Sequence, residues 1–144
     1  MRTAVVAVLA AAAVACSGSG GPAVTVTAVP TGSTPSCERF ARRLPDDLGD
    51  DLPRRDTEPS DPHVAAYGDP PIVVRCGAPP TTAYQAGDQL LTVNGVAWFA
   101  EERFGAVVWS LPRSFVNVEV TIPNEWTGDR LARLSDAVQA AQGG

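Results

Sequence analysis

The sequence contains no lysine and a single histidine, His63, among its 144 residues. Its 11 basic residues are all arginines and face 16 acidic residues, so the net charge is −5. An acidic chain whose only basic clusters are the pairs Arg42–Arg43 and Arg54–Arg55 is poorly suited to bind nucleic acid or anionic lipid. Aspartates flank both pairs, which favours solvated surface positions. We therefore expect no nucleic-acid partner.

The sequence also lacks the signatures of common enzymes. It has no G-x-S-x-G, no phosphate-binding loop and no dinucleotide fingerprint. His63 has neither a second histidine with which to share a metal nor a free cysteine to activate. The acidic run from Asp46 to Pro62 does not have the spacing of an EF-hand loop. We expect no catalysis, no metal and no cofactor, and a glycosidase built on two acids that meet in space is the alternative kept open.

No apolar run is long enough to span a membrane. The longest, Ala4–Ala15, has 12 residues, whereas a spanning helix needs about 20. It follows Arg2 and ends in Ala13-Val14-Ala15-Cys16, which resembles a bacterial lipobox whose cysteine is diacylated. Ala13-x-Ala15 is also an acceptable site for ordinary signal peptidase, so release without a lipid stays open. We expect a signal peptide at 1–15 and lipidation at Cys16.

The stretch after Cys16 has no charge. Residues 17–36 are rich in Ser, Thr, Gly, Pro and Val, and a flexible chain of this length typically spans about 25 Å. We therefore expect a flexible tether at 16–36, with an edge strand at Val24–Thr27 as the alternative. The remaining residues, 37–144, suffice for one domain.

Two of the three cysteines belong to a predicted core. Cys37, Phe40 and Leu44 share one face of a short helix that Ser36 caps and Pro45 ends. In the strand Ile72–Cys76, the side chain of Cys76 lies on the same face as two aliphatic residues. We infer a disulfide Cys37–Cys76, which closes a loop of about 40 residues.

The rest of the chain predicts an antiparallel sheet followed by a helix. Asn94-Gly95 between apolar runs is a strong hairpin signal. Ala106–Leu111 forms a further apolar run, and Phe115–Ile122 alternates between an apolar and a wet face. Leu131, Leu134, Val138 and Ala141 form the buried stripe of a C-terminal helix. The predicted fold is α+β, with a mainly antiparallel sheet of about 4–5 strands, an N-terminal helix, a C-terminal helix and one disulfide.

Several of these motifs resemble a family of small exported actinobacterial proteins known as domain of unknown function 3515. The resemblance covers roughly residues 37–141. It rests on Tyr67–Gly77, on the helix from Cys37 to Pro45, on Val93-Asn94-Gly95-Val96 with Trp98, and on Arg113 with the strand Val116–Pro123. The sequence departs from the family at Tyr67, where tryptophan is expected. The resemblance implies a location in the cell envelope and no particular activity.

Four residues are candidates for a binding surface: Arg75, Arg113, Trp126 and Tyr67. Trp126 lies in a turn, and the two arginines are suited to an acidic ligand, although an ion pair is the simpler role for each. We expect a non-catalytic envelope lipoprotein on the outer face of the cytoplasmic membrane. Its partner would be an unknown envelope protein or a cell-wall component, with the lipid as its only link to the membrane. Binding of a small ligand is the second hypothesis, and a small hydrolase the third.

Overall fold

The computed structural model describes residues 21–29, 34–49 and 51–143. The predicted signal peptide and Cys16 lie outside these ranges, as does the segment 30–33 of the predicted tether. Among the described residues, no helix has the length and apolar character needed to cross a membrane.

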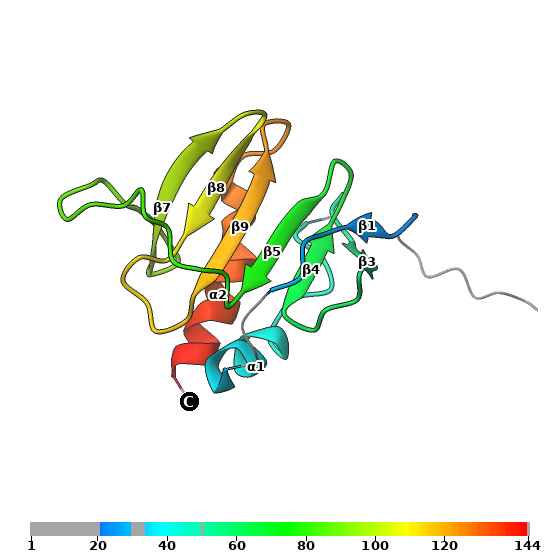
Figure 1. Ribbon diagram of the computed structural model, residues 1–144, viewed down its shortest axis with the longest axis horizontal. Coiled ribbons are helices and arrows are strands. Elements are labelled where there is room, and N and C mark those ends of the chain that lie inside the picture. The colour runs from blue at the N-terminus through cyan, green and yellow to red at the C-terminus, as the bar shows by residue number, and fades with distance from the viewer. Residues whose placement is uncertain (1–20, 30–33, 50, 144) are drawn as a thin grey trace, which may run out of the picture.

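Seven antiparallel strands form the main sheet, in the order β2-β4-β5-β9-β8-β7-β6 (Figure 1). Their bounds are β2 Arg54–Arg55, β4 Val64–Tyr67, β5 Ile72–Cys76, β6 Leu91–Val93, β7 Val96–Arg103, β8 Ala106–Ser110 and β9 Val118–Pro123. The helices are α1 Pro35–Ala41 and α2 Leu131–Gln142, with the 3-10 turn η1 Gly128–Arg130 before α2. The predicted α+β fold is confirmed, with two helices and an antiparallel sheet.

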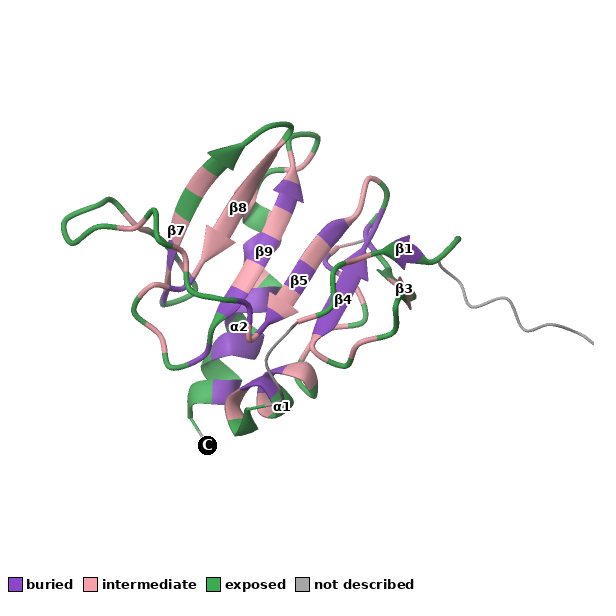
Figure 2. Ribbon diagram, viewed as in Figure 1, coloured by how far each residue is buried: buried purple, intermediate pink, exposed green. Residues whose placement is uncertain are grey.

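The sheet has more strands than the 4–5 predicted. β2 lies in the acidic run from Asp46 to Pro62, for which no strand was predicted. All four residues of β4 are buried, so this strand shows no alternation that a sequence pattern could reveal (Figure 2). β7 continues through Glu101–Arg103, beyond the apolar run that follows Asn94-Gly95.

The core lies between the sheet and the two helices. The side chains of Cys37 and Phe40 from α1 and of Leu131, Leu134, Val138 and Ala141 from α2 are buried against β5, β7 and β9. Trp98 is fully buried, and its indole N–H donates a hydrogen bond of 2.9 Å to the hydroxyl of the buried Ser135. The predicted disulfide Cys37–Cys76 is confirmed, and it fastens α1 to β5 with Cα atoms 5.5 Å apart.

The segment 21–29, here called the strap, packs on the domain. β1, Val24–Thr25, pairs in parallel with β3, Thr57–Glu58. This short strand lies in the region for which a strand at Val24–Thr27 was the alternative to a flexible tether. Val24 is buried, and its backbone N–H donates to the carbonyl of Asp56 over 2.8 Å.

Two charged side chains hold the ends of the strap. The guanidinium of Arg55, whose side chain is 9% exposed, donates to the carbonyl of Pro22 over 2.6 Å and to that of Gly68 over 2.8 Å. The carboxylate of Asp61 accepts a hydrogen bond of 3.0 Å from the backbone N–H of Val29. The strap is therefore part of the folded domain.

Asp61 should lose its hold on the strap only at a pH below the ordinary pKa of its carboxyl. Burial raises the pKa of its carboxyl, but hydrogen bonds from the backbone N–H groups of His63 and Val29, together with the nearby His63 imidazole, hold this pKa below the ordinary 3.8. A depressed pKa contributes stability that is present above the unfolded pKa and is lost as the pH falls through the folded value. We expect the NMR signal of the Val29 amide to shift with a midpoint below pH 3.8.

The Asp61→Asn variant should abolish this shift, whereas Asp69→Asn should preserve it, because Asp69 is exposed and makes no contact with Val29. A Val29 amide that titrates identically in both variants would contradict the role given to Asp61.

Candidate binding groove

The face of the sheet opposite the helices carries polar and half-buried side chains. The strand register aligns Arg75 of β5 with Glu119 of β9, Glu119 with Ser110 of β8, and Ser110 with Phe99 of β7. Glu119 and Thr121 lie on this face, as the alternation of the sequence predicted for the wet side of β9. Neither helix covers this row of residues.

A long connection crosses this open face. Residues 77–90 join β5 to β6 and include the pair Pro79-Pro80 (Figure 1). The ring of Tyr84 lies edge-on to that of Phe99, with centroids 5.4 Å apart, and the hydroxyl of Thr81 donates to the Glu101 carboxylate over 3.2 Å. These contacts hold the 77–90 loop against β7.

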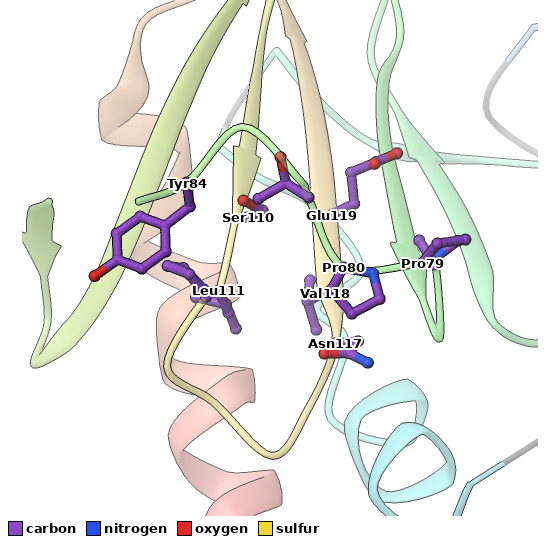
Figure 3. A pocket seen from close by; sticks show the side chains of 11 residues that line it. Pro79, Pro80, Tyr84, Ser110, Leu111, Asn117, Val118 and Glu119 are labelled. Atoms are coloured by element: carbon purple, nitrogen blue, oxygen red, sulfur yellow. The ribbon is translucent and has the colours of Figure 1, made fainter. Parts of the chain in front are cut away.

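Between the loop and the sheet lie two adjoining hollows, which together we call the groove. Figure 3 shows the first of them. The first has a volume of about 170 Å³ and the second about 260 Å³. Ser110, Glu119, Pro79, Pro80 and Thr81 border both. The walls of the first are mainly apolar, with Leu111, Pro112 and Val118, and carry a few polar groups from Tyr84, Asn117 and Glu119.

Ion pairs lie along the groove. Nη1 of Arg75 is 3.1 Å from Oε1 of Glu119, and Nη2 of Arg103 is 2.9 Å from Oε1 of Glu101. Glu101, Arg103 and Glu119 line the second hollow. Both side chains of the Arg75–Glu119 pair are about three-quarters buried or more, with exposures of 20% and 27%. The groove thus presents charges of both signs that are already paired, so no single charge on a ligand is favoured.

Of the four predicted surface residues, two contact residues that line the groove. Arg75 forms the ion pair predicted as its simpler role, and its partner Glu119 lines both hollows. Arg113 is exposed, and its Nε donates to the Tyr84 hydroxyl over 2.9 Å, with the guanidinium 5.9 Å from the ring centre. Arg113 therefore fixes the position of an aromatic ring that lines the first hollow.

The other two predicted residues lie elsewhere. Tyr67 is fully buried, and its hydroxyl donates to the carbonyl of Pro45 over 2.9 Å. Burial raises the pKa of Tyr67 to about 12. Tyr67 is therefore a core residue and is not part of the candidate binding surface. Trp126 is half-buried, donates to the carbonyl of Pro70 over 2.8 Å and stacks with Arg130, so its turn is less exposed than predicted.

His63 lies away from the groove. Its Nδ1 is 3.3 Å from Oδ1 of Asp61, and its side chain is 14% exposed. Within residues 21–29, 34–49 and 51–143, no group of His, Cys, Asp and Glu side chains has an arrangement that would hold a metal ion.

Sequence reasoning missed the residues that form most of the groove, namely Pro79, Pro80, Tyr84, Ser110 and Glu119. The sequence feature that could have indicated them is the length of the 77–90 connection, because a loop of this length without secondary structure in a compact domain is commonly functional. Glu119 was visible only as one polar position on a wet strand face. Its relation to the loop depends on tertiary structure.

The fold is a disulfide-linked α+β domain with two helices on one face of its sheet and the groove on the other. The chain belongs to the family described as Protein of unknown function (DUF3515), which it matches over residues 2–143. This match confirms the resemblance noted from the motifs. No curated protein matches the chain, and no solved structure does.

Proposed function

We propose that this protein is a non-catalytic binding module of the cell envelope, anchored to the outer face of the cytoplasmic membrane by a lipid on Cys16. In this proposal the groove binds a segment of an envelope protein. The leader and the Ala13-Val14-Ala15-Cys16 sequence support export and lipidation. A buried disulfide supports an oxidising compartment outside the cytoplasm.

The observation that carries the binding role is the groove itself. A sheet face that is flat and polar offers little to a partner, whereas this one is hollowed beneath a loop and walled by prolines, Leu111 and Val118. The two hollows share residues and run from Leu111 and Asn117, at one end of β8 and β9, toward Arg103 at the other end, so they form a continuous path along these strands. Such a path suits an extended peptide segment better than a compact molecule.

A small cell-wall component is the second candidate occupant. It is favoured by the first hollow, where apolar walls surround a few polar groups from Tyr84, Asn117 and Glu119. This combination is typical of small-ligand sites, although the volume of about 170 Å³ is below their usual range.

A photo-crosslinking amino acid at Thr82, which is exposed and lines the second hollow, tests the proposal in the native host. We expect discrete protein adducts that are absent when the same amino acid replaces Ala140, an exposed residue of α2. Substitution of Ser110 by tryptophan should fill both hollows, because Ser110 borders each of them, and should remove the adducts.

Three results would separate the alternatives. A thermal shift with soluble cell-wall fragments that Ser110→Trp abolishes, without protein adducts, would favour the small ligand. Equal adducts at Thr82 and Ala140, with no ligand shift, would contradict a binding role for the groove. The intact mass of the membrane-extracted protein tests the anchor separately, since the proposal requires a mature chain that begins at an acylated Cys16.

A further inference from the structure

Two phenylalanines are fully exposed, Phe104 at 107% and Phe115 at 100%. Phe104 occupies the turn between β7 and β8, and Phe115 lies in the loop between β8 and β9. A single exposed apolar residue needs no explanation by itself. The two residues differ in their position relative to the point where the chain enters the domain.

Phe104 lies at the same end of the sheet as the β4–β5 turn, Gly68–Pro71. Antiparallel pairing brings Pro123 of β9 beside Ala106 of β8, and Ala106 beside Arg103 of β7. The Asn124 N–H donates to the carbonyl of Gly105 over 3.1 Å, and the Trp126 indole donates to the carbonyl of Pro70 over 2.8 Å. These bonds link the two turns into one surface, here called the turn end, which is uppermost in Figure 1.

The strap enters the domain at the turn end. The guanidinium of Arg55 bonds both the carbonyl of Pro22 and that of Gly68, so the first described residues lie beside the β4–β5 turn. Only Ser17 to Gly20 separate Cys16 from Gly21. Fully extended, the five residue steps from Cys16 to Gly21 span about 17 Å.

We propose that the turn end contacts the lipid bilayer, with the ring of Phe104 inserted at the membrane interface. This inference rests on the proposed lipid anchor at Cys16. A linker this short between the lipid and the domain keeps the turn end close to the head groups. The turn end therefore has a high effective concentration at the bilayer. The aromatic ring then gains the free energy of leaving water without the cost of bringing a free protein to the membrane.

The charges around Phe104 indicate which lipid composition the turn end would favour. Arg103 is 58% exposed but already pairs with Glu101, and Glu102 and Asp69 are exposed carboxylates on the same end. Charges of both signs give little net attraction to an anionic surface. Insertion should therefore depend on the ring and the anchor, and only weakly on the content of anionic lipid.

Phe115 provides a matched control because it is equally exposed at the opposite end of the sheet. Its loop lies beside the C-terminus of α2, where the Gln142 side chain donates to the Ser114 hydroxyl over 2.7 Å. The Phe104→Cys and Phe115→Cys variants can each be labelled with the environment-sensitive fluorophore NBD, since Cys37 and Cys76 are joined and Cys16 would carry the lipid.

The experiment uses lipidated protein in phosphatidylcholine vesicles, with and without phosphatidylglycerol. We expect a blue shift and an intensity gain of NBD at position 104, quenching there by lipids with nitroxide-labelled acyl chains, and neither effect at position 115. The unlabelled Phe104→Ser variant should reduce protection of the β7–β8 turn from a soluble protease by about 10-fold or more, as expected from the free energy of burying a phenylalanine. Phe115→Ser should leave this protection unchanged.

Mass spectrometry of the same sample separates failure of the anchor from failure of the contact. An acylated chain whose NBD at position 104 stays in water would overturn the membrane contact and leave the anchor standing. Quenching at position 115 in place of 104 would reverse the orientation and overturn the inference as well. Protein adducts of a photo-crosslinker at 104, without lipid quenching, would assign the ring to a protein partner instead. An unacylated chain would remove the premise together with the anchor.

Discussion

Replacement of both Cys37 and Cys76 by alanine should lower the free energy of unfolding by about 4 kcal/mol. The bond joins residues separated by 39 positions, and removing such a cross-link restores chain entropy to the unfolded state. Both cysteines are buried, at 3% and 1% exposure, so the variant also leaves small gaps in the core. Urea unfolding of the soluble chain that begins at Ser17 measures the change.

Reductant provides the control for this experiment. It should destabilise the parent chain by a similar amount and should have no effect on the alanine variant. A loss of less than about 1 kcal/mol would contradict the entropic account. For a small domain a loss of the expected size is a large share of total stability.

Substitution of Trp98 by alanine should cost about 3–5 kcal/mol, the range for emptying a buried aromatic site. Trp98 is fully buried between β7 and α2, and its removal would also leave the hydroxyl of Ser135 without its partner inside the core. Thermal and urea unfolding, followed by circular dichroism because a tryptophan is removed, measure the loss.

Trp109 lies on the neighbouring strand, β8, and its side chain is only half-buried. It therefore supplies the matched comparison. Trp109→Ala should therefore cost clearly less than Trp98→Ala. A third variant, Ser135→Ala, isolates the hydrogen bond and should cost about 1–3 kcal/mol, since the indole N–H would remain buried and unpaired. Equal losses for the two tryptophans would contradict the assigned difference in their burial.

The parts of the fold that could be predicted from the sequence depend on local periodicity. The apolar stripe of α2 and the alternation of β9 each bury one face, so their side chains show the pattern directly. The disulfide followed from the same logic, because Cys37 and Cys76 each fell on a buried face. Asn94-Gly95 marked the β6–β7 turn. Asn94 has a positive φ of 46° there, a conformation that few residue types other than glycine adopt.

The parts that were missed depend on contacts between distant segments. β2 and β3 have two residues each, too few for any period, and exist because β4 and the strap provide hydrogen-bonding partners. The groove has the same origin, since its loop and its floor are joined by Tyr84–Phe99 and Thr81–Glu101 contacts across the chain. Tyr67 was placed on the surface because a strand end gives no sign of which elements will cover it.

The strap also determines how the protein should respond to a mechanical load on its anchor. A pull from the N-terminal side reaches the Arg55–Pro22 contact first and then the short β1–β3 pair, before it reaches α1. Beyond that point the disulfide passes the force covalently from α1 into β5, an inner strand of the sheet. We therefore expect the strap to peel away at low force and to free the chain between Gly21 and Thr34, whose fully extended length is about 45 Å, while the sheet, the helices and the groove remain folded.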